Sequence, residues 1–335
     1  MADVPNVVAD IAPVQSLVAK VMGDLGDPKI VVQPGVSPHG YSMRPSEAAA
    51  LQDADLVFWI GEDLTPWLED AIETLAEDAN VTSLLEADGT KLLDFREGAL
   101  FEDHGHKDSE HDEHAEEEGH DDHDNEDHAK DEGHDEHDHE EHSDHEDQGD
   151  HDEDDHAAHD DHDHGELDPH AWLSPQNAST WLNVIAAQLS AADPDNAGAY
   201  FTNAAAARDE METLAEDVND MLEPVRGGNF IVFHDAYQYF EDDFDFPASG
   251  AISLGDASDP SPARIAEIQQ RIDDEGVSCV LAEPQFNPGI VATVLEGTEV
   301  STGVIDPLGV QLQPGAEFYP QLIRKMAQTL VGCLE

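Results

Sequence analysis

Residues 199–222 read AYFTNAAAARDEMETLAEDVNDML, an alanine-rich stretch in which charged residues recur with helical periodicity. Counted from Pro194, this pattern predicts one helix of about 28 residues, roughly 42 Å long at 1.5 Å per residue. That is longer than a typical helix of a globular domain. The helix is therefore expected to join two separate folding units.

Short apolar stretches alternate with helical patterns on both sides of this helix. The expected strands are 6–9, 29–33, 55–61, 81–85, 229–233, 250–254, 277–282 and 299–305. The expected helices are 13–22, 45–52, 66–76, 175–190, 261–274, 288–295 and 317–334. Strands that alternate with helices predict parallel sheets with helices on both faces.

We therefore predict an α/β fold with two lobes, each with a mainly parallel sheet flanked by helices, joined by a single long helix. The expected N-terminal lobe is 1–192, the linking helix 193–225 and the C-terminal lobe 226–335. Ligands of such sheets bind at the carboxyl ends of the strands. A binding site is therefore expected between the lobes.

Seventeen of the 20 histidines lie between His104 and His164, interleaved with aspartate and glutamate. Residues 102–166 have almost nothing apolar to bury, so they are expected to form a solvated, disordered insertion in the first lobe. Imidazole is a preferred ligand of zinc, copper and nickel, so this tract is predicted to bind several ions weakly. The alternative is an acidic linker that happens to contain histidine. The expected weak ligands are His104, His106, His111, His114, His120, His123, His137, His139, His162 and His164.

The formal net charge is −65 at pH 7, from 78 acidic and 13 basic residues. Nucleic acid and anionic membrane surfaces are unsuitable partners because like charges repel, whereas cations are favoured. No apolar run reaches the roughly 18 residues that a membrane span needs. No signal peptide is visible. The strand-like residues 6–9 follow Met1 almost at once, as expected of an exported protein whose leader has been replaced by a start methionine.

Two cysteines are present, Cys279 in the apolar stretch 277–281 and Cys333 near the end of the final helix. A disulfide between them would close a loop of about 55 residues and contribute roughly 4 kcal/mol on the chain-entropy model. Such a bond would indicate an oxidising compartment. The alternative is a pair of buried free thiols.

Three histidines lie outside the tract, and each stands where a ligand-binding loop is expected. His39 and His234 follow predicted strands, and His170 lies in a turn before a predicted helix. Asp306 ends the strand 299–305 in the same manner. The four side chains are candidates for one tetrahedral metal site. Taken singly, each also suits a turn or core residue, and their separations carry no metal-binding spacing.

Five segments together carry a resemblance to a known family. They are SPHGYSMRPSEAAALQDADLVFWIG (37–61), LDPHAWLSP (167–175), FHDAYQYF (233–240), AEPQFNP (282–288) and IDPLG (305–309). The chain resembles, over nearly its whole length, the zinc-binding component of bacterial high-affinity zinc ABC importers. These proteins form the ZnuA-like branch of the metal-receptor (cluster A-I) solute-binding proteins. The resemblance implies a periplasmic, non-enzymatic receptor with two lobes joined by a rigid helix, which captures one Zn²⁺ and delivers it to a membrane permease.

The same resemblance assigns roles to particular residues. His39, His170 and His234 match the three family histidines, and Asp306 matches the acid that completes the site in related receptors. Manganese-type relatives usually have glutamate at the third position, so His234 favours zinc. Some zinc receptors have an acid directly before the first histidine, whereas this chain has Pro38. The fourth ligand is therefore expected to be Asp306, then water, then a histidine of the tract.

Other residues also take a role from the resemblance or from position. The Cys279–Cys333 pair resembles a disulfide of zinc-type members, which favours the bridge. Asp235 and Glu283 are candidates, on position alone, to accept hydrogen bonds from the ligand histidines. For Asp235 the alternative is a plain solvent-exposed acid. The expected partners are an ABC permease and, as a further candidate, a periplasmic zinc chaperone. The receptor is expected to be a monomer.

Three other functions remain open from the sequence. A metalloenzyme would use three histidines and an open zinc position, but no H-E-x-x-H motif or comparable catalytic signature is present. A manganese or iron receptor of the same fold would differ in metal preference. A periplasmic zinc buffer or chaperone would use the tract without a transporter.

Overall fold

The computed structural model describes residues 4–96, 101, 167–253, 255 and 260–335. The insertion predicted at 102–166, with its candidate weak metal ligands, lies outside the described residues. Among the helices that are described, none has the length and apolar character that crossing a membrane requires.

The first half of the chain builds a parallel four-stranded sheet in the order β2-β1-β3-β4. Its strands are β1 (Val7–Ala9), β2 (Lys29–Ile30), β3 (Leu56–Trp59) and β4 (Asn80–Ser83). The helices between them are α1 (Ala12–Met22), α2 (Pro45–Gln52) and α3 (Pro66–Leu75). The central strands β1 and β3 are buried at every residue, which explains their continuous apolar sequences.

The second half repeats this arrangement as β6-β5-β7-β8, again with parallel pairing. Its strands are β5 (Phe230–His234), β6 (Gly250–Ser253), β7 (Cys279–Ala282) and β8 (Ser301–Val304). The helices are α6 (Gln238–Phe244), α7 (Pro262–Glu275), α8 (Pro288–Val294) and α9 (Phe318–Leu334). Two sheets of identical strand order confirm the predicted α/β class with two parallel sheets.

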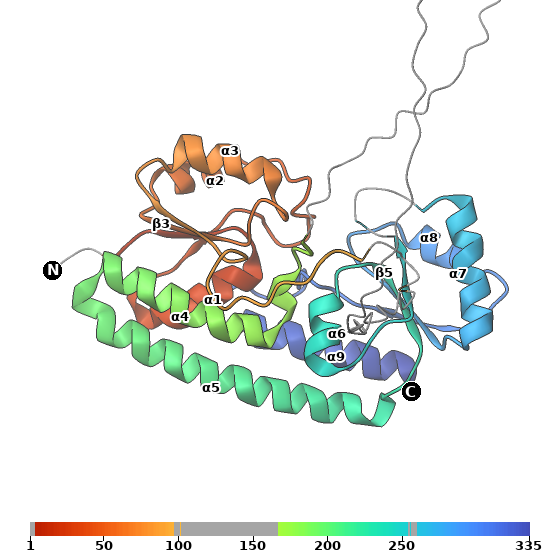
Figure 1. The fold of residues 1–335 in the computed structure, drawn as a ribbon. Coiled ribbons are helices and arrows are strands. Elements are labelled where there is room, and N and C mark those ends of the chain that lie inside the picture. The colour runs from red at the N-terminus through yellow and green to blue at the C-terminus, as the bar shows by residue number, and fades with distance from the viewer. Residues whose placement is uncertain (1–3, 97–100, 102–166, 254, 256–259) are drawn as a thin grey trace, which may run out of the picture. The chain divides into compact units, whose positions relative to one another are not determined.

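The predicted long helix is α5 (Ala197–Leu222), with 26 residues between short 3₁₀ turns. It packs along α4 (Pro175–Ala192) and also contacts α1 and α9, so it touches helices of both halves (Figure 1). One hydrophobic cluster includes buried residues of both halves, among them Phe58, Leu214 and Leu281. The long helix is thus part of a continuous core. The lobe boundaries at 192 and 226 stay a prediction.

A disulfide and a backbone bridge each connect parts of the chain that are far apart in sequence. Cys279 of β7 and Cys333 of α9 form a disulfide with a Cα–Cα distance of 5.6 Å, which confirms the predicted bridge. The residues that flank the insertion also meet. Asp94 and Leu167 form an isolated antiparallel bridge, and the Asp168 N–H donates to the Leu93 carbonyl at 2.9 Å.

Candidate metal centre

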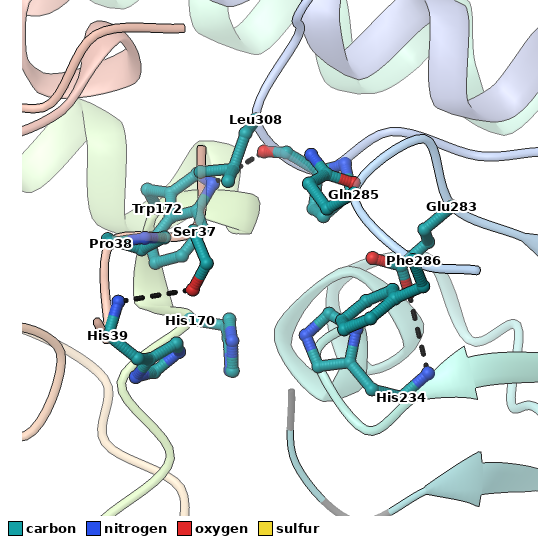
Figure 2. A pocket seen from close by; sticks show the side chains of 11 residues that line it. Ser37, Pro38, His39, His170, Trp172, His234, Glu283, Gln285, Phe286 and Leu308 are labelled. Atoms are coloured by element: carbon teal, nitrogen blue, oxygen red, sulfur yellow. Dashed lines mark hydrogen bonds and ion pairs between the residues drawn. The ribbon is translucent and has the colours of Figure 1, made fainter. Parts of the chain in front are cut away.

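The three histidines predicted to bind metal come together in one pocket. His39 lies in the loop between β2 and α2, His170 at the start of a 3₁₀ turn before α4, and His234 at the end of β5. The ring centroids of His39 and His170 are 5.7 Å apart, and those of His170 and His234 are 5.4 Å apart. Figure 2 shows His170 between the other two rings, with all three lining the pocket.

These spacings suit a shared ion. A tetrahedral zinc bound through one nitrogen of each ring, at about 2.0–2.1 Å, places neighbouring imidazole centroids about 5 Å apart. Across the described part of the chain, however, no three histidine, cysteine or acidic side chains already have the arrangement of a metal site. Two of the three ring pairs therefore lie near the separation that a shared ion needs, and coordination requires these side chains to reorient.

Carboxylates orient two of the rings. Nδ1 of His170 lies 2.7 Å from Asp168 Oδ1, and Nδ1 of His234 lies 2.7 Å from Glu283 Oε1. Both acids are buried. A proton shared between Nδ1 and a carboxylate makes Nε2 the nitrogen that coordinates metal. Burial raises the pKa of Asp168 to about 7, against the effects of the His170 N–H and Arg96.

Of the two acids expected beside the histidines, Glu283 is confirmed as a partner of His234. Asp235 is buried and pairs with Arg96, so it is not a solvent-exposed acid. Its expected role toward a ligand histidine stays a prediction. Asp168, which holds His170, was missed by the sequence analysis. The one available signal was the Asp-Pro-His turn, in which an aspartate precedes the histidine by two residues.

Arg96 pairs with two buried acids, one of which is the residue directly after His234. Its guanidinium lies 2.5 Å from Asp235 Oδ1 and 2.8 Å from Glu241 Oε2, and these acids are only 1% and 6% exposed. Burial raises the pKa of both carboxyl groups, and Arg96 opposes that rise. The guanidinium carbon also lies 3.6 Å from the centroid of the Phe101 ring. Arg96 thus ties the segment before the insertion to the residue that follows His234.

Apolar side chains form much of the remaining wall. Trp172 lies 5.2 Å from the His170 ring and Phe286 lies 5.4 Å from the His234 ring, measured between centroids. The pocket is completed mainly by Pro38, Pro307 and Leu308, together with Ser37, Glu283 and Gln285. Apolar surroundings limit access of water and strengthen electrostatic attraction between a cation and its ligands.

Comparison with known families agrees with this geometry. Residues 7–333 match the model of the family described as ZnuA, zinc-uptake complex component A, periplasmic. The chain belongs to the ZnuA family.

Individual relatives in the ZnuA family cover almost all of the chain. The high-affinity zinc uptake system protein ZnuA of Paracoccus denitrificans is 44% identical over 334 residues, which is 99% of this chain and 93% of that protein. Its counterpart from Brucella abortus is 41% identical over 98% of this chain and 91% of that protein. A crystal structure of ZnuA has a TM-score of 0.71 at 19% identity, covering 99% of this chain and all of the other. This last likeness shows a shared fold.

Asp306, which the sequence predicts as the fourth ligand, is placed differently from the histidines. It is not among the residues that line the pocket, although its neighbours Pro307 and Leu308 are. Its Oδ1 accepts hydrogen bonds from the Leu308 N–H and from Gln285, and its Oδ2 accepts one from the Val310 N–H at 2.6 Å. The structure therefore brings three of the four predicted ligands together and holds Asp306 in the adjacent loop.

Proposed function

We propose that this protein is the periplasmic receptor of a zinc ABC importer. It captures one Zn²⁺ through Nε2 of His39, His170 and His234 and delivers the ion to a membrane permease. The observation that carries the proposal is the gathering of three imidazoles in one pocket, two of them with a carboxylate on Nδ1. Family membership supports the same function, because its named members are zinc-uptake components of the periplasm.

Asp306 is our candidate for the fourth ligand, ahead of water and of a tract histidine. A carboxylate has about four acceptor positions, and three on Asp306 are used by Leu308, Gln285 and Val310. One position on Oδ2 therefore remains for a metal without loss of these bonds. A short movement of the loop would bring that oxygen toward the ion.

The ligand set favours zinc over manganese or iron. Three imidazoles are softer donors than the carboxylates that suit manganese, and zinc lies above both metals in the usual order of affinities. Measuring how well Mn²⁺ and Fe²⁺ displace Zn²⁺ distinguishes a zinc receptor from a manganese or an iron receptor. For a purely binding role, a zinc-loaded chain should show no turnover of ester or peptide substrates.

The partners and organisation follow from the same proposal. The permease is the expected membrane partner, the receptor acts as a monomer, and a periplasmic zinc chaperone is a further candidate partner. The N-terminal lobe, linking helix and C-terminal lobe are proposed as 1–192, 193–225 and 226–335. A zinc buffer without a transporter predicts unchanged zinc uptake in cells that lack the protein, whereas the receptor predicts impaired uptake at low zinc.

A metal titration of three chains tests the site. The first is the full chain, the second has residues 102–166 replaced by a short Gly-Ser linker, and the third carries His170→Ala. We expect one tight equivalent of zinc that survives removal of the tract, with affinity changed by less than about tenfold, or 1.4 kcal/mol. That equivalent should disappear with His170→Ala. Tight binding that is lost when the tract is removed, and that persists in His170→Ala, would show that the pocket is not the site.

A further inference from the structure

His39 has a different kind of support from the other two histidines. His234 ends a buried strand, and His170 begins a helical turn beside the acid that contacts its ring. His39 lies instead in the irregular segment 31–44, which contains neither helix nor strand. The direction of its side chain therefore depends on contacts that hold this loop in place.

One peptide group in the loop is held at both ends. The indole N–H of Trp67 donates to the Pro38 carbonyl at 2.7 Å, and the His39 N–H donates to Ser37 Oγ at 3.3 Å. Figure 2 shows the second of these bonds beside the His39 ring. The carbonyl and the N–H belong to the same planar Pro38–His39 peptide unit. Fixing that plane restrains the direction in which the His39 side chain leaves the backbone.

Trp67 is itself well placed to act as an anchor. It is the second residue of α3 and packs against the buried clusters on both faces of the first sheet. Its ring also lies 5.8 Å from that of Tyr41, whose hydroxyl donates to Glu47 of α2 at 2.8 Å. Trp67 thus contacts the loop on both sides of His39, at Pro38 and at Tyr41.

We propose that the indole N–H of Trp67 is a positioning group for metal binding. It holds the Pro38–His39 peptide so that the His39 imidazole meets the rings of His170 and His234. The inference rests on the zinc site proposed above. A coordinating group must be held within about 0.5 Å and 10–20° of its working geometry. A loop without this hydrogen bond samples a wider range of directions, and each excursion removes one of three nitrogen ligands.

Two replacements of Trp67 in the full chain test the hydrogen bond. Trp67→Phe removes the N–H and part of the ring, whereas 3-benzothienylalanine at the same position replaces only the N–H by sulfur. Zinc affinity is measured by competition with a chelating dye, well below the unfolding temperature. We expect both chains to bind zinc about tenfold more weakly or worse, the range seen when groups that orient metal ligands are removed. The unfolding temperature of the benzothienylalanine chain without metal should stay within a few degrees of wild type.

Trp181→Phe is the matched control. It removes another indole hydrogen bond, donated to Thr90 Oγ1 at 2.9 Å, from a fully buried ring that does not line the pocket. This change should lower the unfolding temperature and leave zinc affinity unchanged.

Binding by the benzothienylalanine chain within twofold of wild type would overturn the inference, even if Trp67→Phe binds weakly, since packing would then explain the loss. His39→Ala separates this failure from failure of the site. If His39→Ala loses tight binding while the benzothienylalanine chain keeps it, only the role of Trp67 is wrong. If His39→Ala also keeps wild-type affinity, the proposed zinc site itself is wrong.

Discussion

Oδ1 of Asp168 and Oε1 of Glu283 each lie 2.7 Å from Nδ1 of a histidine of the proposed site. An ionised carboxylate in this position fixes the tautomer of the ring and raises the basicity of the opposite nitrogen. At the residue scale, the strength of the proposed metal site is therefore expected to depend on buried acids that need not touch the ion. Glu283 allows the clearer test because it comes from β7 and its loop, whereas Asp168 lies in the same turn as His170.

Glu283→Gln should weaken zinc binding by about 10- to 100-fold, because an amide holds the His234 N–H without a full negative charge. Chelator competition measures the change. Glu267→Gln is the control, since Glu267 is a largely exposed acid paired with Arg264 on α7. Equal affinities of the two variants would show that Glu283 contributes nothing to the metal site.

Asp10 provides a prediction about stability and pH. Burial raises its pKa from 3.8 to about 7, although the N–H groups of Ile11 and Ile60 oppose the rise. The folded state therefore holds the proton more tightly than the unfolded chain. The resulting stability is full below about pH 4 and is lost as pH rises through about 7. That loss amounts to at most about 4 kcal/mol.

Asp10→Asn cannot titrate, so its free energy of unfolding should lack this part of the fall between pH 4 and pH 8. Urea unfolding of the metal-free chains across that range measures the difference. The variant also loses one acceptor for a backbone N–H, which lowers its stability by a constant amount. Asp209→Asn on the exposed face of α5 is the control. Parallel pH profiles for wild type and Asp10→Asn would contradict the prediction.

The sequence alone predicted which histidines come together, but it predicted only some of the acids that contact their rings. An aspartate stands close to two of them, Asp168 two residues before His170 and Asp235 directly after His234. The first contacts a ring nitrogen of His170. The second pairs with Arg96, 139 positions away along the chain. Local spacing cannot reveal this choice, because it depends on which distant cation the fold brings to the acid.

At the scale of elements, the strong patterns were predicted well and the element ends less well. Helix α5 was recognisable because its buried residues recur every three or four positions, from Tyr200 to Leu222. Strand β2 is shorter than the predicted 29–33 and ends at Ile30. Backbone bonds to the first segment continue as far as Val32, whose N–H donates to the Asp10 carbonyl, but the chain already bends at residues 31 and 32. The apolar sequence 29–33 does not reveal where this bend begins.

The disulfide fastens the final helix to a central strand of the second sheet. The bond closes a loop across 54 positions, so Cys279→Ser with Cys333→Ser should lower the free energy of unfolding by roughly 4 kcal/mol. Chemical denaturation of the oxidised wild type and the double variant measures the effect. Zinc affinity well below the unfolding temperature should be unchanged, since neither cysteine lines the pocket. Identical unfolding midpoints would show that the bond contributes no stability.

At the scale of the whole molecule, the hydrophobic core limits how the metal site adjusts, and the net charge affects how cations approach. The hydrophobic cluster that includes both halves gives the receptor a continuous interior. Adjustment of the metal site is therefore expected to come mainly from loops and side chains rather than from a free hinge. The net charge of −65 acts outside that interior and attracts cations to the surface from a distance.

The association rate of zinc should therefore fall about tenfold between low salt and a few tenths molar salt, because the Debye length shrinks from about 30 Å at 0.01 M. Stopped-flow mixing in sodium perchlorate measures the rate. Replacing residues 102–166 by a short linker removes 33 of the 78 acids and should reduce the salt dependence. A rate that does not change with salt would show that long-range attraction has no part in capture.

The bridge between Asp94 and Leu167 has an evolutionary consequence. Because Asp94 and Leu167, which flank the insertion, already lie side by side, an inserted segment of almost any length fits between them at small entropic cost. Recombination at this junction would replace one segment by another without repacking the interior. We therefore expect a change in the length or composition of that segment to leave the imidazole pocket intact, which makes the junction a natural position for grafting a sensor.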